Sequence, residues 1–444
     1  MNPTVITRFA PSPTGYFHAG SYRTALFAYI YAKQHLGKFI LRIEDTDRER
    51  SKKEYEDNIM DSLKWLGLIH DEFYRQSDRG DIYKKYIQKF IDSGQAYVSK
   101  ETPKEPGGRT EVIRFRNANK KVAFDDLIRG KVEFDTTELG DFVIAKTIDE
   151  PIFHLVNVVD DFEMKVTHVI RGEDHISNTA RQILIYEALG APIPLFAHIP
   201  LLLAADRSKL SKRNGAVPIT EYRKKGYMPE AVINYLALLG WHPADDAEIL
   251  SFADIIREFS LKRVQKSGAI FDEEKLKWFN RQYLQKLSDQ QFIENAETFL
   301  PEWMGTKSGT LKRILPLLRD KISSFGEIQQ LFGAGGELAF VSNMHEYPPG
   351  MLLWKKNPDK TAAKIHLTEC KNILEKIKPE NFTTEAVKNS VLPYAEIKGR
   401  GDVLWPLRVA LTGQEKSPDP FVSASILGKD GSLERLDAAI KKCD

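Results

Sequence analysis

The N-terminal segment of the chain alternates apolar runs with turn residues. Val5 to Phe9 is an apolar run typical of a buried strand, and Pro11 to Gly15 has the Pro and Gly residues of a loop. From Ser21 to Gln34, apolar and aromatic side chains recur at helical spacing. Gly37 is placed to end that helix before a second apolar run, Lys38 to Ile43. This order predicts a βαβ unit with a parallel sheet.

The pattern changes between residues 94 and 155, where short β-branched and aromatic runs alternate with turn clusters such as Pro106-Gly107-Gly108. We interpret this stretch as an inserted α+β domain. The earlier pattern then returns as a strand over Val166 to Arg171, a helix over Ser177 to Leu189 and a strand over His198 to Leu203. The predicted fold is therefore α/β, with a parallel sheet that the insert splits in sequence.

Beyond Pro218 the pattern is mainly helical. Amphipathic stretches cover Pro229 to Leu239, Glu273 to Leu284 and Ala363 to Ile377. A run of Gly and small residues at Phe332 to Gly336 suggests a boundary between two helical modules.

Composition excludes several classes of protein. The chain has 444 residues, 42% apolar and 28% charged, and no stretch reaches the ~18 uninterrupted apolar residues of a membrane span. The first ten residues do not resemble a secretory signal, so we expect a cytoplasmic protein. Cys370 and Cys443 lack the spacing of a disulfide framework or a zinc site. A net charge of +2 makes a globally basic nucleic-acid coat improbable, so any such surface must be local.

The first candidate for chemistry is His18-Ala19-Gly20, at the predicted start of the first helix. Free N–H groups and the positive end of the helix dipole attract phosphate there. Gly20 would let a nucleotide approach the backbone, and His18 could donate a hydrogen bond to a phosphate oxygen. A histidine that only caps the helix is the alternative.

The second candidate is the lysine loop, Lys209 to Arg213, which follows an apolar strand. From Arg207 to Arg213 the chain carries four basic residues and no acidic one, which suits the charge that develops on a triphosphate. Taken alone, a loop of this kind is more often a solvated basic turn.

The two candidates together, almost two hundred residues apart, resemble the class I aminoacyl-tRNA synthetases, and further motifs resemble glutamyl-tRNA synthetase of the bacterial type. The resemblance covers nearly the whole chain. Its motifs are Arg8 to Gly15, Leu41 to Asp47, Asn157 to Asp161, Ile170 to His175, Leu404 to Gly413 and Leu427 to Ile440.

The resemblance implies a class I synthetase Rossmann-type sheet split by the insert and followed by all-α C-terminal domains. The expected domains are a first catalytic half (1–93), an acceptor-binding insert (94–155), a second catalytic half with the lysine loop (156–220), a helical stem-contact domain (221–321) and anticodon-binding modules (322–444).

The resemblance also implies roles for individual residues. Arg8 would meet the side-chain carboxylate of glutamate, Arg171 would pair with a substrate carboxylate, and Glu44 with Ser12 would hold the α-amino group; Asn157 lies in the stretch that lines this pocket. The implied catalytic residues are His18, Gly20, Lys209 and Lys212. The implied ATP-binding residues are Pro11, His18, Gly20, Glu173, Lys209, Ser211 and Lys212.

The sequence departs from the family's pattern in the amino-acid pocket. Phe153 stands where a tyrosine is usual, so a hydroxyl donor that would help read the substrate is missing. The segment Lys100 to Val112 is also shorter than in many relatives, and Ala96 to Lys100 has no cysteine for a zinc knuckle, so no metal site is expected in the protein.

The expected function is therefore ATP-dependent ligation of glutamate to tRNA-Glu, through glutamyl adenylate, with ATP and Mg²⁺ and no membrane or DNA partner. We expect a monomer. Three alternatives remain: an enzyme that also charges tRNA-Gln, a glutamyl-queuosine tRNA synthetase, which would lack the helical extension, and a tRNA-binding regulator, which would have lost the signatures.

Overall fold

The computed structural model describes residues 4–102, 110–210, 217–305, 308–342, 346–356 and 358–444. The chain forms two compact units, residues 1–282 and 283–444. Among the helices in these described ranges, none combines the length and the apolar character that crossing a membrane requires.

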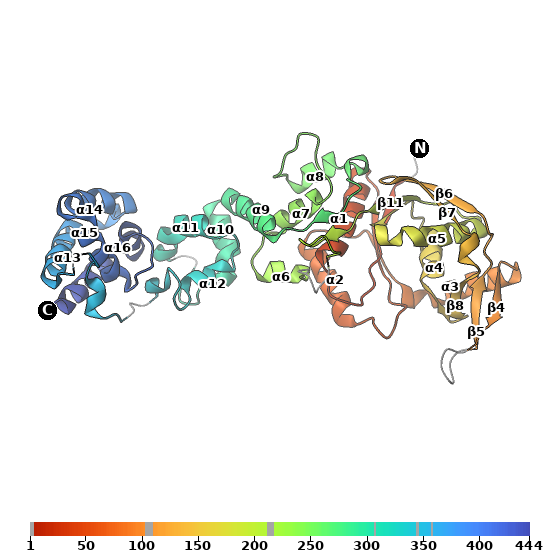
Figure 1. The fold of residues 1–444 in the computed structure, drawn as a ribbon, viewed down its shortest axis with the longest axis horizontal. Coiled ribbons are helices and arrows are strands. Elements are labelled where there is room, and N and C mark those ends of the chain that lie inside the picture. Colours follow the sequence, from red (N-terminus) through yellow and green to blue (C-terminus); the bar gives the residue numbers. More distant parts are fainter. Residues whose placement is uncertain (1–3, 103–109, 211–216, 306–307, 343–345, 357) are drawn as a thin grey trace. The chain divides into compact units, whose positions relative to one another are not determined.

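A seven-stranded sheet organises the first unit (Figure 1). Its order is β3-β2-β1-β10-β11-β6-β7, and the pairs from β3 through β11 are parallel. The strands are β1 (Ile6–Phe9), β2 (Lys38–Ile43), β3 (Glu72–Arg75), β10 (His168–Gly172), β11 (Leu195–Ile199), β6 (Lys121–Asp126) and β7 (Gly130–Asp135). The strand order reverses between β1 and β10, and open α/β sheets bind ligands at the carboxyl ends of the strands beside such a point.

In the described part of this unit, eight α-helices precede residue 260, and some of them pack on the sheet. They are α1 (Ala19–Gln34), α2 (Lys53–Trp65), α3 (Gly80–Asp92), α4 (Phe153–Glu163), α5 (Ile176–Leu189), α6 (Ile219–Lys224), α7 (Pro229–Leu238) and α8 (Phe252–Glu258). The chain continues through α9 (Glu273–Lys286). The predicted first βαβ unit is confirmed as β1-α1-β2.

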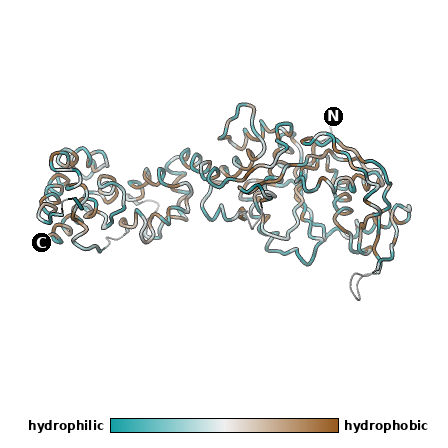
Figure 2. The backbone as a smooth tube through the Cα atoms, in the orientation of Figure 1, coloured by the Kyte–Doolittle hydropathy of each residue, from teal (hydrophilic) through white to brown (hydrophobic). Residues whose placement is uncertain are grey.

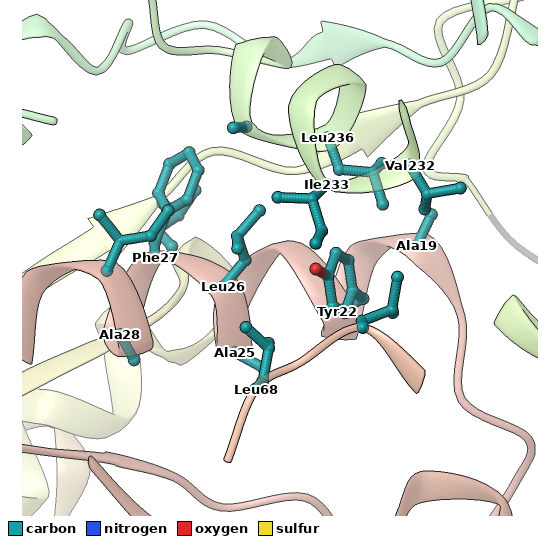
Figure 3. Close-up of a cluster of buried hydrophobic side chains, with 14 of the residues drawn as sticks. Ala19, Tyr22, Ala25, Leu26, Phe27, Ala28, Leu68, Val232, Ile233 and Leu236 are labelled. Carbon is teal, nitrogen blue, oxygen red and sulfur yellow. The ribbon is translucent and has the colours of Figure 1, made fainter. Parts of the chain in front are cut away.

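Helix α1 is the central packing element. Figure 3 shows Leu26 and Tyr22 of α1 facing Val232, Ile233 and Leu236 of α7, and all five side chains are buried. Burying each large apolar side chain contributes roughly 1.5–3 kcal/mol. This packing fixes α1 relative to α7.

Gly37 ends α1 for a steric reason. A Cβ atom at this position would lie 2.1 Å from the carbonyl oxygen of Val5, so only glycine allows the chain to turn tightly into β2 beside β1.

The insert differs from its prediction in one respect. Part of it forms a separate four-stranded antiparallel sheet of β4 (Ala96–Lys100), β5 (Glu111–Phe115), β8 (Phe142–Thr147) and β9 (Glu150–Pro151). The β6-β7 hairpin instead joins the main sheet, because Asp126 of β6 pairs with Phe196 of β11. The insert therefore contributes two strands to the main sheet.

The predicted strand His198 to Leu203 is wrong as one continuous element. It divides into the end of β11 and a short strand β12 (Leu202–Leu203), which pairs with β13 (Ala269–Ile270). Pro200 lies between them and has no N–H for the sheet ladder, so the chain leaves the main sheet there.

The second unit is helical around its own apolar core, and Figure 2 shows apolar and polar segments alternating along its helices. Its helices are α10 (Asp289–Ala296), α11 (Gly309–Lys321), α12 (Glu327–Phe332), α13 (Lys360–Glu375), α14 (Thr384–Lys398), α15 (Arg400–Thr412) and α16 (Pro420–Lys442). Side-chain caps begin five of them, at Ser288, Ser308, Asp359, Thr383 and Asp419.

His168 of β10 makes the first unit sensitive to acid. Its ring contacts the hydroxyl groups of Tyr31 (3.3 Å) and Thr167 (2.8 Å), and burial lowers its pKa from 6.5 to about 4. Between pH 6.5 and 4 the unfolded chain binds this proton and the folded chain does not. The free energy of unfolding therefore decreases as the pH falls through that window.

We expect His168→Gln to flatten this dependence, because glutamine can contact both hydroxyl groups without titrating. The measurement is the melting temperature of both proteins from pH 7.5 to pH 5, each referred to its own value at pH 7.5. Equal acid-induced decreases would show that His168 does not bind a proton on unfolding.

Candidate functional site

The predicted substrate residues gather in a cavity of about 1500 Å³ at the carboxyl ends of β1, β2 and β10. Of the residues predicted from the sequence, those that line it are Arg8, Pro11, Ser12, His18, Gly20, Glu44, Phe153, Asn157, Arg171 and Lys209. Ser211 and Lys212 lie outside the described residues. The cavity is thus built where the topology places a ligand site.

Arg42 is the structural centre of the cavity wall. Its side chain is completely buried on β2 and donates from Nη1 to Asp161 (2.7 Å) and from Nη2 to Glu44 (3.0 Å), while Nε lies 3.6 Å from Asp160. Burial alone would lower the pKa of Arg42, but the three carboxylates raise it above its ordinary value. Asp161 also accepts a hydrogen bond from Nε of Arg8 (3.1 Å). These contacts tie β1, β2 and α4 together.

Three charged groups keep unused hydrogen-bonding atoms at the cavity. Within the part of the chain that the structure describes, no protein hydrogen bond is recorded for Nη1 and Nη2 of Arg8, for Nη1 of Arg171 or for Oε2 of Glu44. All three residues line the cavity. It therefore offers two cations and one anion to a ligand.

Arg171 is the strongest indication that this ligand is anionic. Its side chain is buried at the end of β10, and its recorded partners are neutral: His198 at Nε (3.1 Å), with Thr179 (2.7 Å) and Gln182 (2.8 Å) at Nη2. Burial, with the nearby charge of Arg8, lowers the pKa of Arg171 to about 9. A carboxylate that bound here would stabilise the charged guanidinium and offset this lowering of its pKa.

Glu44 complements these cations. Its Oε1 accepts hydrogen bonds from Arg42 (3.0 Å) and from Nδ2 of Asn157 (2.9 Å), and Gln182 fixes the amide of Asn157 (3.1 Å). Burial raises the pKa of Glu44 in spite of the attraction of Arg42 and Arg8. A ligand ammonium group would favour its charged form.

The other end of the cavity suits phosphates. His18 is the residue before α1, with extended backbone, and no cap hydrogen bond from its side chain is recorded. The ring instead lies 3.4 Å from the hydroxyl of Ser21. A Cβ atom at Gly20 would lie 3.3 Å from the ring, so glycine leaves that ring room. Within the described residues, the side chain of His18 thus does not cap the N–H groups of the first turn of α1, which attract an anion.

Both flanks of the lysine loop are anchored near this end. Leu210 N donates to Leu202 O (2.8 Å), and Ile219 N donates to Phe17 O (2.9 Å), directly before His18. Lys209 is paired with Asp174 (3.0 Å). Although burial opposes it, this hydrogen bond keeps the pKa of Asp174 below its usual value. Two segments that are far apart in sequence therefore meet at the phosphate end.

Glu173 is placed differently from the other predicted residues. It is absent from the cavity lining, its Oε1 accepts the N–H of Leu201 (2.7 Å), and its Oε2 is paired with Arg129. Its carboxylate supports the wall behind the cavity.

Phe153 begins α4 and lines the cavity. Its ring packs against the rings of His154 (5.4 Å between centroids) and His175 (5.6 Å). Burial, with the charge of Arg171, lowers the pKa of His175 to about 4, so this imidazole is neutral at physiological pH. Burial lowers the pKa of His154 to about 4 as well, so both imidazoles that contact Phe153 are neutral.

Sequence reasoning assigned no role to several residues that hold the site, namely Arg42, Asp126, Asp160, Asp161, Gln182 and His198. Arg42 had a detectable signal, a charge inside the apolar run Lys38 to Ile43. Asp126 and His198 had none, because only the sheet brings them together. Among the described residues, no group of three or more His, Cys, Asp or Glu side chains could hold a metal ion.

The chain matches two protein families and is similar in sequence to known enzymes. The family of class I tRNA synthetases (E and Q), catalytic domain, matches residues 4–107 and 104–278, and an anticodon-binding domain family matches residues 291–440. The chain is 41% identical to a glutamate–tRNA ligase of Aquifex aeolicus, over 99% of each chain, and 40% identical to one of a Sulfurihydrogenibium species, over 97% and 98%.

Two solved structures of glutamate–tRNA ligases are also similar to this chain. The crystal structure of a glutamate tRNA ligase from Elizabethkingia meningosepticum in complex with its amino acid is similar to this chain with a TM-score of 0.87 and 33% identity, over 99% of this chain and 100% of that one. Glutamate-tRNA synthetase from Elizabethkingia anophelis gives a TM-score of 0.83 at 33% identity, over the same shares.

We expect Asp161→Asn to destabilise the first unit by about 3–5 kcal/mol, because it leaves the buried charges of Arg8 and Arg42 without their shared carboxylate. The measurement is hydrogen exchange of peptides from β1, β2 and α4 in the full chain.

Asp61→Asn is the matched control, since Asp61 pairs with Arg223 (3.0 Å) at the surface and its loss should cost less than about 1 kcal/mol. Equal effects of the two variants would show that the buried cluster does not hold these elements together.

Proposed function

Since this chain belongs to the glutamate–tRNA ligases, within the class I tRNA synthetases for glutamate and glutamine, we propose that its cavity binds glutamate and ATP and joins them as glutamyl adenylate. The protein is an ATP-dependent aminoacyl-tRNA ligase. The observation that carries the assignment to this cavity is the buried guanidinium of Arg171, which has neutral protein partners and unused capacity for an anion.

Glutamate matches the charges of the cavity. Its two carboxylates would use Nη1 and Nη2 of Arg8 and Nη1 of Arg171, and its ammonium group would use Oε2 of Glu44 together with Ser12. Asn157 would act by holding Glu44. Glutamine would leave one buried cation without a counter-charge, which a buried site penalises strongly.

ATP would occupy the other end of the cavity. The N-terminus of α1, with His18 and Gly20, and Lys209 would surround its phosphates, and Pro11 would line the approach. Ser211 and Lys212 complete this set as predictions from the sequence alone. Glu173 would act from behind the wall, through Arg129 and Leu201. Mg²⁺ would accompany the triphosphate and neutralise its charge.

The reaction then requires positioning and charge stabilisation. An oxygen of the glutamate α-carboxylate attacks the α-phosphorus of ATP, a P–O bond forms, and the bond to the β-phosphate breaks to release pyrophosphate. His18 and Lys209 would stabilise the charge that develops on the phosphates. The terminal ribose hydroxyl of tRNA next attacks the activated carbonyl, and AMP leaves.

Full-length similarity favours this function over glutamyl-queuosine tRNA synthesis, because residues 291–440 match an anticodon-binding domain. The signatures at His18, Gly20 and Lys209 favour it over a binding-only regulator. We propose further that the tRNA substrate is tRNA-Glu and that the enzyme acts as a monomer in the cytoplasm.

The direct test is aminoacylation by the purified full chain with ATP, labelled glutamate or glutamine, and tRNA-Glu or tRNA-Gln. We expect acid-precipitable glutamyl-tRNA with tRNA-Glu and glutamate, and at least ~100-fold lower kcat/KM with glutamine, because a buried cation would be left unpaired. The tRNA-Gln reactions determine whether the enzyme discriminates between the two tRNAs. A folded protein that forms no glutamyl-tRNA would overturn the proposal.

Phe153→Tyr should restore a donor at the cavity wall. A hydrogen bond to a substrate carboxylate would lower the KM for glutamate by about 10-fold, with little change in the KM for ATP. Steady-state kinetics at saturating tRNA measures both constants.

Phe162→Tyr is the matched control, because Phe162 lies at the opposite end of α4 and does not line the cavity. An unchanged KM for glutamate in Phe153→Tyr would show that position 153 does not contact the substrate.

A further inference from the structure

A chain of hydrogen bonds links the inserted hairpin to the cavity. Asp126 ends β6, His198 lies in β11 and Arg171 lies in β10, which are neighbouring strands of the main sheet. Nδ1 of His198 lies 2.6 Å from Oδ2 of Asp126, and Nε of Arg171 lies 3.1 Å from Nε2 of His198. The side chains of Asp126 and His198 are fully buried. Arg171 is the member of the chain that reaches the cavity.

The chemistry of these groups fixes the tautomer of His198. An arginine Nε–H can only donate, so Nε2 of His198 must present a lone pair to Arg171. The proton of the neutral ring is then on Nδ1, from which it is donated to Asp126. Burial, opposed by Asp126, lowers the pKa of His198, which agrees with a neutral ring.

Asp126 is itself held in place. Its Oδ1 accepts the backbone N–H groups of Ile128 (2.9 Å) and Arg129 (2.8 Å), in the turn between β6 and β7. Oδ2 is directed at His198, with the ring N–H at 2.6 Å and the backbone N–H at 3.1 Å, and the same backbone N–H lies 3.3 Å from Oδ1.

We propose that Asp126 and His198 are positioning residues that orient Arg171 toward a carboxylate of glutamate; this inference rests on the proposed function. His198 holds Nε of the guanidinium, Thr179 and Gln182 hold Nη2, and the planar group can then turn only Nη1 to the substrate. The inserted segment thereby supplies a determinant of amino-acid binding through the β6-β7 hairpin.

Asp126→Asn tests the proposal without changing the size of the side chain. In the place of Oδ1 the amide oxygen would accept the N–H groups of Ile128 and Arg129 and keep the 3.3 Å contact with the backbone N–H of His198, which turns the NH₂ group toward Nδ1 of His198. The ring proton would move to Nε2, where Oγ1 of Thr179 (3.1 Å) can accept it but the Nε–H of Arg171 loses its acceptor, so two donors would face each other between His198 and Arg171.

We expect this variant to raise the KM for glutamate by about 10-fold or more, with the KM for ATP within about twofold of wild type, because a contact to a charged group is disturbed. Long-range ¹H–¹⁵N spectra of histidine-labelled enzyme should show His198 changing from the Nδ1–H to the Nε2–H tautomer.

The matched control is Asp135→Asn. Asp135 ends β7 of the same hairpin and is exposed, and in the described residues its carboxylate accepts hydrogen bonds from Thr137 alone. This variant should keep wild-type KM values for glutamate and ATP.

A second pair of variants keeps the test decisive if Asp126→Asn fails to fold. In His198→Gln, one amide can donate to Asp126 and accept from Arg171, whereas His198→Leu can do neither. His198→Gln should therefore retain more glutamate affinity than His198→Leu.

The outcomes separate the two levels of the argument. A wild-type enzyme that charges no glutamate overturns the proposed function and this inference with it. A normal wild type with an unchanged glutamate KM in Asp126→Asn overturns this inference alone. Equal increases in the KM for glutamate and for ATP, or equal losses in His198→Gln and His198→Leu, would show a merely structural pair and also overturn it.

Discussion

The rest of the site depends on the buried guanidinium of Arg42. It lies among the carboxylates of Glu44, Asp160 and Asp161. Asp161 also accepts a hydrogen bond from Arg8, and Glu44 accepts one from Asn157, so the cluster positions two charged groups that line the cavity. A charge without water must be paired, so the cluster has few alternative arrangements. The strand ends of β1 and β2 and the helix α4 are positioned by that requirement.

The two ends of the cavity differ in how deeply their charged groups are buried. At one end, the charged side chains of Arg8, Glu44 and Arg171 are buried. Each uses some of its atoms to contact the protein and keeps others for a ligand of complementary charge. At the phosphate end, the backbone of the α1 N-terminus and the exposed Lys209 offer positive potential with less burial. In the proposed function, the amino acid and the nucleotide would therefore bind through different groups at one edge of the sheet.

The insert is part of the catalytic sheet. Its β6-β7 hairpin pairs with β11, its turn supplies Arg129 to Glu173, and Asp126 reaches Arg171 through His198. A substitution in that hairpin would therefore affect both Glu173 and Arg171.

The sequence by itself determined the α/β class, the β1-α1-β2 unit, the helical C-terminal region and ten of the residues that line the cavity, because these follow from local periodicity and from motifs close in the chain. Tertiary structure decided the rest. The hairpin joined the main sheet, the strand at Pro200 divided, and Glu173 turned behind the wall. The pairing of Asp126 with His198 spans 72 residues, and no local pattern specifies which buried polar group satisfies another at that separation.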